Sequence, residues 1–240
     1  MKKLTLLLVI TAASVSGFSQ IGNPLKKAGE ILNSAKNGES TSLSAEEIAA
    51  GLKEALSVGA SNSTNRLSAA DGFLKDAAVK ILMPEEFRKI ESKMRAVGMG
   101  KLFDNAVTSM NRAAEEAAKK AAPIFLNAIK SMSIKDAVGI LRGDELAATT
   151  YLKNTTSADL TASFKPVIAE SLEKVEATKY WTELFTVYNK FSKEQVNTDL
   201  TDYVTQKSLE GIFYYVGLEE KKIRKDPAAR VSDILEKVFK

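Results

Sequence analysis

Apolar residues recur every three or four positions over most of the chain after Ser44, which is the spacing of one face of a helix. Ser44 followed by Glu47 is a capping-box pair and indicates the start of a long helix. Pro123 predicts a break or kink between two helices, because proline cannot donate a backbone hydrogen bond. We expect helices over residues 24–36, 44–67, 84–97, 101–121, 124–132, 134–142, 144–153, 156–175, 199–225 and 227–240.

Two stretches differ from this pattern. Residues 77–83, which follow a turn at Asp71-Gly72, are the only ones that we interpret as extended. Residues 212–216 (Ile-Phe-Tyr-Tyr-Val) are apolar on every side of a helix, which predicts the most buried helix of the fold. Alternating patterns typical of strands are nearly absent. The sequence therefore predicts an all-α protein, a single bundle-like domain of about nine to eleven helices with little or no sheet.

The first residues have the three-part layout of a secretory signal peptide. Two lysines follow Met1, residues 4–15 are apolar, and the small residues Gly17 and Ser19 precede Gln20. This apolar run is shorter than the roughly 20 residues that span a bilayer, and no later run is longer. The alternative is an uncleaved N-terminal anchor. We expect cleavage near Gln20, a periplasmic or otherwise exported mature chain without a transmembrane segment, and three regions: signal peptide 1–19, helical arm and linker 20–42, and all-helical domain 43–240.

The composition excludes several kinds of chemistry. The chain has no histidine and no cysteine, so it has no disulfide, no thiolate or imidazole metal site and no Ser-His-Asp triad. Without Lys2 and Lys3, the 34 basic residues fall to 32 against 30 acidic residues. This near-neutral balance gives no sign of a nucleic-acid partner. We predict no catalytic residue, no metal and no cofactor.

One helix carries a polar cluster of Asn111, Arg112 and Glu115. It could bind a small polar ligand, or it could be a solvated face with ion pairs between successive turns. A second candidate lies near the C-terminus, where Arg224 and Arg230 flank the start of the last expected helix and could bind an anion. The alternative there is that Asp226 caps that helix and Arg224 matches the dipole of the preceding one.

Aromatic and acidic residues provide two further candidates. The aromatic residues, at helical spacing, could line an apolar pocket near Trp181 and Tyr214 or could simply be core. The acids could supply oxygen ligands to calcium or magnesium, but each lies where a helix start favours an acidic side chain. The residues concerned are Trp181, Phe185, Tyr188, Tyr214 and Tyr215 for the pocket, and Asp136, Asp144 and Glu145 for the metal.

Several short motifs occur together from about Leu43 to the C-terminus. They are Gly51-Leu-Lys-Glu-Ala-Leu56, Asp71-Gly-Phe73, Met110-Asn-Arg-Ala-Ala-Glu115, Asp136-Ala137 with Ile140-Leu141, Ala147-Ala-Thr149 with Tyr151, Tyr203-Val-Thr205 and Ile223-Arg-Lys-Asp-Pro-Ala-Ala-Arg230. In order and spacing the set resembles the bacterial family called domain of unknown function 4197. The resemblance implies an envelope-directed helical domain with no established activity. Many relatives resemble lipoproteins, and this chain differs by lacking the cysteine that carries the lipid.

These observations favour a non-catalytic periplasmic binding or interaction domain whose partner is an envelope protein or a small ligand. One alternative is a helical carrier that holds an apolar ligand such as a lipid between helices near Trp181 and Tyr214. The other is an envelope enzyme that depends on two converging carboxylates, one of them in an apolar setting. The spacing of the acidic residues assigns no such pair.

Overall fold

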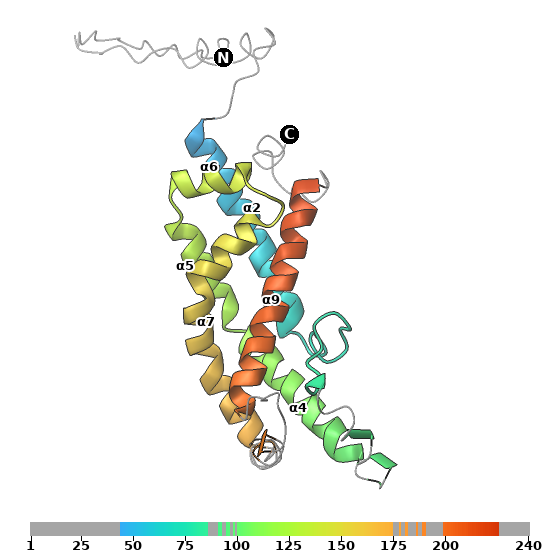
Figure 1. Cartoon of the computed structure of the whole chain (residues 1–240). Coiled ribbons are helices and arrows are strands. Elements are labelled where there is room, and N and C mark those ends of the chain that lie inside the picture. The colour runs from blue at the N-terminus through green and yellow to red at the C-terminus, as the bar shows by residue number, and fades with distance from the viewer. Residues whose placement is uncertain are drawn as a thin grey trace, which may run out of the picture. The chain divides into compact units, whose positions relative to one another are not determined.

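The computed structural model describes residues 44–85, 91–92, 95–96, 98, 100–174, 178, 181, 186, 189–190 and 199–225. The chain divides into the units Met1–Ser42 and Leu43–Lys240, and every described residue belongs to the second. The expected signal peptide, arm and last helix therefore lie outside the described residues. The helices are α2 (Ala45–Ser68), α4 (Gly100–Ala118), α5 (Ala121–Ser131), α6 (Ile134–Arg142), α7 (Ala147–Glu173) and α9 (Leu200–Lys225) (Figure 1).

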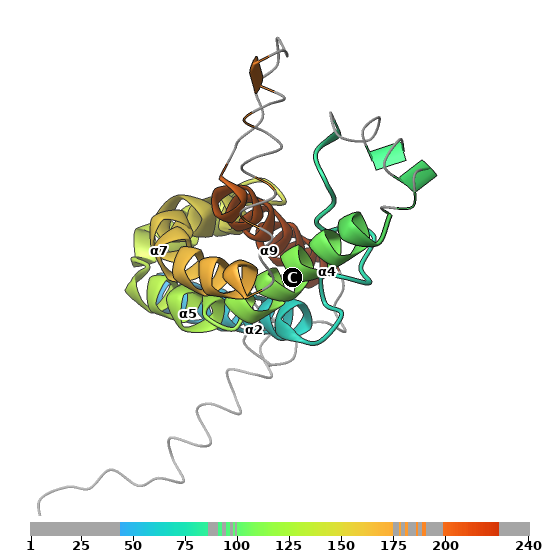
Figure 2. The ribbon, with the colours of Figure 1, turned by 90° about the horizontal axis from the view of Figure 1, so that it is seen from below.

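The described part of the protein is all-α, as the sequence predicts, and it contains no strand. The helices α2, α7 and α9 form most of the bundle, with α7 packed on α9, α4 and α5, and α2 packed on α9, α5 and α6 (Figures 1 and 2). One hydrophobic core connects them, and Phe73, Phe125 and Phe164 are among its fully buried side chains. No described helix combines the length and the apolar run that crossing a bilayer requires.

The described residues hold six helices, fewer than the nine to eleven expected for the whole chain. One cause is α7, which is continuous where we predicted two helices with a break near Thr156. The Thr156 hydroxyl donates to the carbonyl of Leu152, four residues earlier, instead of capping a new helix. Thr155, Ser157 and Thr161 make the same kind of bond. Pro166 lies within α7 without ending it.

The predicted starts of α2 and α6 are confirmed by their caps. Ser44 and Glu47 form a reciprocal capping box at the start of α2, and Ser133 and Asp136 form another at the start of α6. The break between α4 and α5 falls at residues 119–120, just before Pro123. Pro123 is thus in the first turn of α5. Backbone N–H groups in a first turn have no partner within the helix, so the lack of one at proline costs nothing there.

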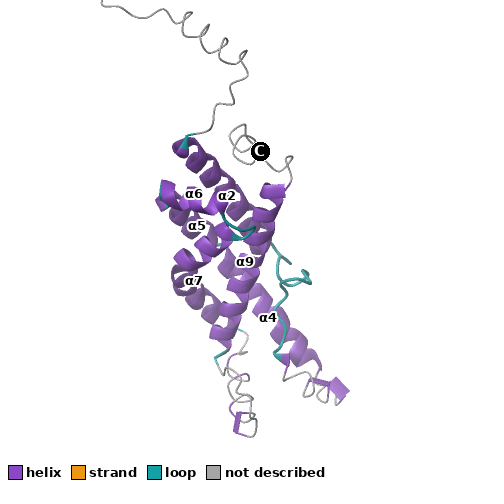
Figure 3. Cartoon of the chain, turned by 45° about the horizontal axis from the view of Figure 1, so that its top comes forward, coloured by secondary structure: helices purple, strands orange, loops and turns teal. Residues whose placement is uncertain are grey.

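The segment predicted to be extended, residues 77–83, forms no strand: residues 77–79 are in turns, and the chain leaves the turns only from Lys80 onward. After α2 the chain turns at Asp71, whose φ of 70° lies in the left-handed region that aspartate tolerates. Turns continue to Val79, and an irregular segment follows over 80–84. We call residues 69–85 the α2 loop (Figure 3). It contributes the buried side chains of Phe73, Val79 and Ile81 to the core, so it is part of the fold and not a surface connection.

The apolar block in α9 is buried with one exception. Ile212, Phe213, Tyr215 and Val216 are buried, and the Phe213 ring packs edge-on against Phe125 at 5.8 Å between centroids. Tyr214 is 47% exposed. The block is therefore not buried on every side, because none of the described helices covers the face of α9 that carries Tyr214.

Gly211 permits the close contact between α9 and the α2 loop. An added Cβ would lie 2.7 Å from Cε1 of Phe73 and 3.2 Å from Cβ of Val79. We predict that Gly211→Ala destabilises the protein by about 1–3 kcal/mol, the usual effect of overpacking a core, partly offset by better helix propensity.

The matched control is Gly139→Ala in α6, where an added Cβ meets nothing within 4 Å. This change should stabilise the protein by about 0.5–1 kcal/mol, because alanine loses less backbone entropy in a helix. Thermal melts of both variants check the pair. Equal effects from the two substitutions would show that the contact at Gly211 is not tight.

Candidate functional site

The polar cluster on α4 is directed at the α2 loop. The Asn111 side chain is fully buried, and its amide makes a two-point pair with Ile81. Its Oδ1 accepts the Ile81 N–H at 2.8 Å, and its Nδ2 donates to the Ile81 carbonyl at 2.8 Å. Nδ2 also donates to the carbonyl of Val107 at 2.7 Å. Asn111 thus satisfies both backbone groups of a buried residue that no helix or strand satisfies.

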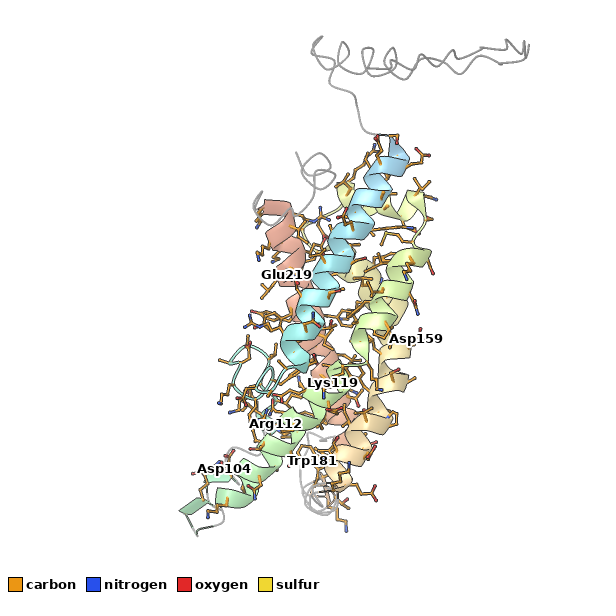
Figure 4. All side chains as sticks on the ribbon, turned by 180° about the vertical axis from the view of Figure 1, so that it is seen from behind. Asp104, Arg112, Lys119, Asp159, Trp181 and Glu219 are labelled. Atoms are coloured by element: carbon orange, nitrogen blue, oxygen red, sulfur yellow. The ribbon has the colours of Figure 1, made fainter. Side chains whose placement is uncertain are left out.

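Glu115 holds the other end of the loop. Its Oε1 accepts the N–H groups of Phe73 and Leu74, both at 3.1 Å, and its Oε2 accepts from Arg112 Nη1 at 2.7 Å. Arg112, which is labelled in Figure 4, also donates to Asp71 at 2.7 Å. Hydrogen bonds from Lys75 and then Arg112 hold the pKa of Asp71 below its ordinary value. The three predicted ligand-binding residues Asn111, Arg112 and Glu115 therefore lie together, and their contacts are with their own chain.

A third anchor joins the loop to α2 and α9. The Asp76 carboxylate accepts from Arg66 at 2.9 Å and from the Tyr215 hydroxyl, and the Arg66 guanidinium lies 4.4 Å from the Tyr215 ring centroid. Burial alone raises the pKa of Asp76, but the hydrogen bonds from Tyr215 and Arg66 outweigh it, so that the pKa is lowered overall. This contribution to stability is present above the unfolded-state pKa and is lost as pH falls through the lowered folded-state pKa.

Arg224 belongs to a different cluster, at the junction of α6, α7 and α9. It donates to Glu220 through Nε at 3.0 Å and to the Ile140 carbonyl, near the end of α6, at 2.9 Å. Glu220 in turn accepts the N–H groups of Ala148 and Thr149, in the first turn of α7, at 3.0 and 2.8 Å. The Arg224–Glu220 pair thus caps the end of α6 and the start of α7, and α7 has no side-chain cap at its own N-cap residue.

Sequence reasoning missed Glu220. The sequence could have indicated it, because Glu220 follows the buried residues Phe213, Val216 and Gly217 at the spacing of one helix face. An acid at such a position needs a buried partner, and Arg224 is one turn further along the helix. The other predicted anion-binding residue, Arg230, and the predicted cap Asp226 lie outside the described residues.

The structure does not place Trp181 and Tyr214, the two residues at the centre of the predicted aromatic pocket, in one pocket. Trp181 is buried, and its ring packs on that of Tyr203 with 5.3 Å between centroids. Tyr214, three turns along α9 from Tyr203, is exposed and makes an edge-on contact with Tyr215. The predicted pocket residues Phe185 and Tyr188 lie outside the described residues.

Two open grooves flank Tyr214. The loop–α9 groove has a volume of about 560 Å³ and lies between the end of the α2 loop and α9. The α7–α9 groove, of about 550 Å³, lies on the other side of Tyr214, between the first half of α7 and α9. The loop–α9 groove is lined by residues 78–85 with Tyr203, Lys207, Glu210, Gly211 and Tyr214, and the α7–α9 groove by Leu146, Thr149, Thr150, Lys153, Ser157, Gln206, Leu209, Glu210, Phe213 and Tyr214.

The acids considered as metal ligands lie in separate contacts. Asp136 caps α6, and Asp144 accepts the N–H of Leu146 at 2.8 Å. Glu145 pairs with Lys221 and Lys225 of α9. Over the described ranges, no three acidic side chains are grouped so that they could hold a metal ion.

We predict that Arg224→Ala destabilises the protein by about 3–5 kcal/mol, because it leaves the Glu220 carboxylate buried and without its guanidinium partner. The side chains of Arg224 and Glu220 are only 15% and 4% exposed, so solvent cannot replace the lost interaction well. Lys222→Ala, an exposed position on the same helix, is the matched control and should change stability by no more than about 0.5 kcal/mol. Denaturant unfolding measures both. Equal losses from the two variants would contradict the role given to Arg224.

Comparison with known proteins identifies a family. Searches of curated proteins and of solved structures found no match to the chain. The model of the family described as "Protein of unknown function (DUF4197)" matches residues 42–240, which include every residue of the clusters and grooves described above. The resemblance in the sequence motifs is thereby confirmed, and the chain belongs to the DUF4197 family.

Proposed function

We propose that this protein is an exported, non-catalytic binding domain, and that it holds its partner on the surface formed by Tyr214 and the two grooves beside it. The observation that carries the proposal is the half-exposed Tyr214 between two grooves of about 560 and 550 Å³. Exposed aromatic side chains of this kind are the usual anchors of protein interfaces.

Other exposed apolar side chains support the same surface. Leu82, which is 51% exposed, lines the loop–α9 groove opposite Tyr214, and Leu218 is exposed one turn further along α9. Among the described residues, the large apolar side chains that are exposed are these three and Ile134. Three of the four are thus on or next to α9, and Ile134 is on α6, so apolar exposure is concentrated beside the grooves.

The environments of the acids favour binding over catalysis. Glu115 and Glu220 are the buried carboxylates of the described residues, and both oxygens of each accept hydrogen bonds from backbone N–H groups or arginine. A general acid of raised pKa needs the opposite environment, an apolar one. The grooves are open and contain charged side chains, which suits a macromolecular partner better than an enclosed lipid.

Export is the second part of the proposal. It rests on the basic start, the apolar run and the small residues before Gln20. We predict that protein recovered from its native host begins at or within a residue or two of Gln20 and fractionates with the cell envelope. N-terminal sequencing checks this, and recovery of an intact Met1 or a cytosolic fraction would contradict it.

The binding surface is tested by native mass spectrometry of protein purified from its host. We predict a bound species on the wild type that is lost from Tyr214→Ala, because truncating an interface anchor typically costs about 2 kcal/mol or more of binding energy. Ile134→Ala is the matched control, since Ile134 is also exposed but lies on α6. Equal loss from both variants, or a bound species that tolerates Tyr214→Ala, would contradict the placement of the site.

A further inference from the structure

The loop–α9 groove has one wall of non-helical backbone. Helices satisfy their own N–H and C=O groups internally, but residues 80–84 are irregular and need other partners. Ile81 obtains both of its partners from Asn111 on α4. Since the N–H and C=O of one residue point to the same side only in extended backbone, this two-point pair fixes Ile81 as strand-like.

The direction of the next residue follows from this geometry. Successive residues of an extended chain turn their backbone groups to opposite sides. Accordingly, the Leu82 carbonyl faces away from α4 and accepts the Tyr203 hydroxyl of α9 at 2.8 Å. The Ile81 carbonyl and the Leu82 N–H belong to one trans peptide and point in opposite directions, and the Ile81 carbonyl faces Asn111. It follows that the Leu82 N–H is directed away from α4, toward the groove that Leu82 lines, and within the described part of the chain nothing accepts a hydrogen bond from it. The groove thus presents the free edge of a short extended segment.

The charges of the groove favour an acidic occupant. Lys207 and Glu210 of α9 pair with each other at 2.7 Å, and Glu85 has an interaction of its own. Lys80 is exposed and forms no ion pair with a described residue. The acidic residue nearest in effect is Asp104, which forms an ion pair with Arg95. The hydrogen bond from Arg95 is the main cause that lowers the pKa of Asp104, and the charge of Lys80 contributes less. Of the two lysines that line the groove, Lys207 is thus paired directly, whereas Lys80 is not, so that a carboxylate entering the groove can pair with Lys80.

We propose that the loop–α9 groove binds an extended, acidic segment of a partner protein as an added strand along Leu82. A carbonyl of the partner accepts the Leu82 N–H, a partner N–H uses the second lone pair of the Leu82 carbonyl, and an acidic side chain pairs with Lys80. Tyr214 and the Leu82 side chain hold the apolar residues of the segment. This inference rests on the proposed function and specifies its partner.

A phage-displayed library of random linear peptides, selected on the mature protein, provides the probe. The decisive variant is Leu82→Pro, which removes the groove-facing N–H and keeps the carbonyl, and which suits the extended residue before it. Leu82→Ala is the control, because it loses the same side chain but keeps the N–H. We expect the selected peptides to be acidic and to bind Leu82→Pro about threefold to tenfold more weakly than Leu82→Ala, the effect of one hydrogen bond. Lys80→Glu should weaken the same peptides further.

Amide hydrogen exchange of the wild type gives a readout that does not depend on the proline variant folding. The Leu82 amide should become protected when a selected peptide binds. Absence of binders, or binders that leave the Leu82 amide unprotected and tolerate both Leu82→Pro and Lys80→Glu, overturns the inference. If such binders still require Tyr214, the proposed binding surface survives without strand addition. If these peptides also bind Tyr214→Ala as tightly as the wild type, the proposed binding surface is contradicted as well.

Discussion

The Asn111 side chain pairs with both backbone groups of Ile81 and so holds a buried non-helical segment against α4. An all-helical protein that buries a non-helical segment must supply partners for the backbone of that segment, because a buried N–H or C=O without one costs about 1–3 kcal/mol. Here α4 supplies them through Asn111 and Glu115. The α2 loop can then place Phe73 and Ile81 in the core and still form one wall of a groove.

The same contact connects the fold to the proposed function. Because Asn111 holds Ile81 from the α4 side, the backbone groups of Leu82 are turned toward α9. Tyr203 then fixes the spacing between loop and helix, supported from behind by the buried Trp181. The residues that the sequence suggested as ligand-binding on α4 thus act on the groove indirectly, by shaping the wall opposite Tyr214.

Much of this fold can be predicted from the sequence. Where the prediction failed, the physical reason can be named. Local signals were sufficient for the capping box at Ser44 and for the start of the helix after Ser133, because a cap involves only neighbouring residues. The helix start predicted at Thr156 was wrong, because a threonine hydroxyl can either cap a new helix or donate to a carbonyl four residues earlier in a continuing one. The roles of Asn111 and Glu220 depend on residues 30 and 72 positions away. Spacing along one helix cannot supply such information, nor can it show which side of α9 is left uncovered at Tyr214.

Amide hydrogen exchange of Asn111→Ala measures whether Asn111 holds the α2 loop at Ile81. We expect the Ile81 amide to lose its protection, whereas the Phe73 and Leu74 amides, held by Glu115, and the amides of α7 keep theirs. Asn105→Ala, an exposed position on the same helix, should leave all of them unchanged. An Ile81 amide that remains as protected in Asn111→Ala as in the wild type would show that another contact holds the loop, and that Asn111 does not have the role given to it.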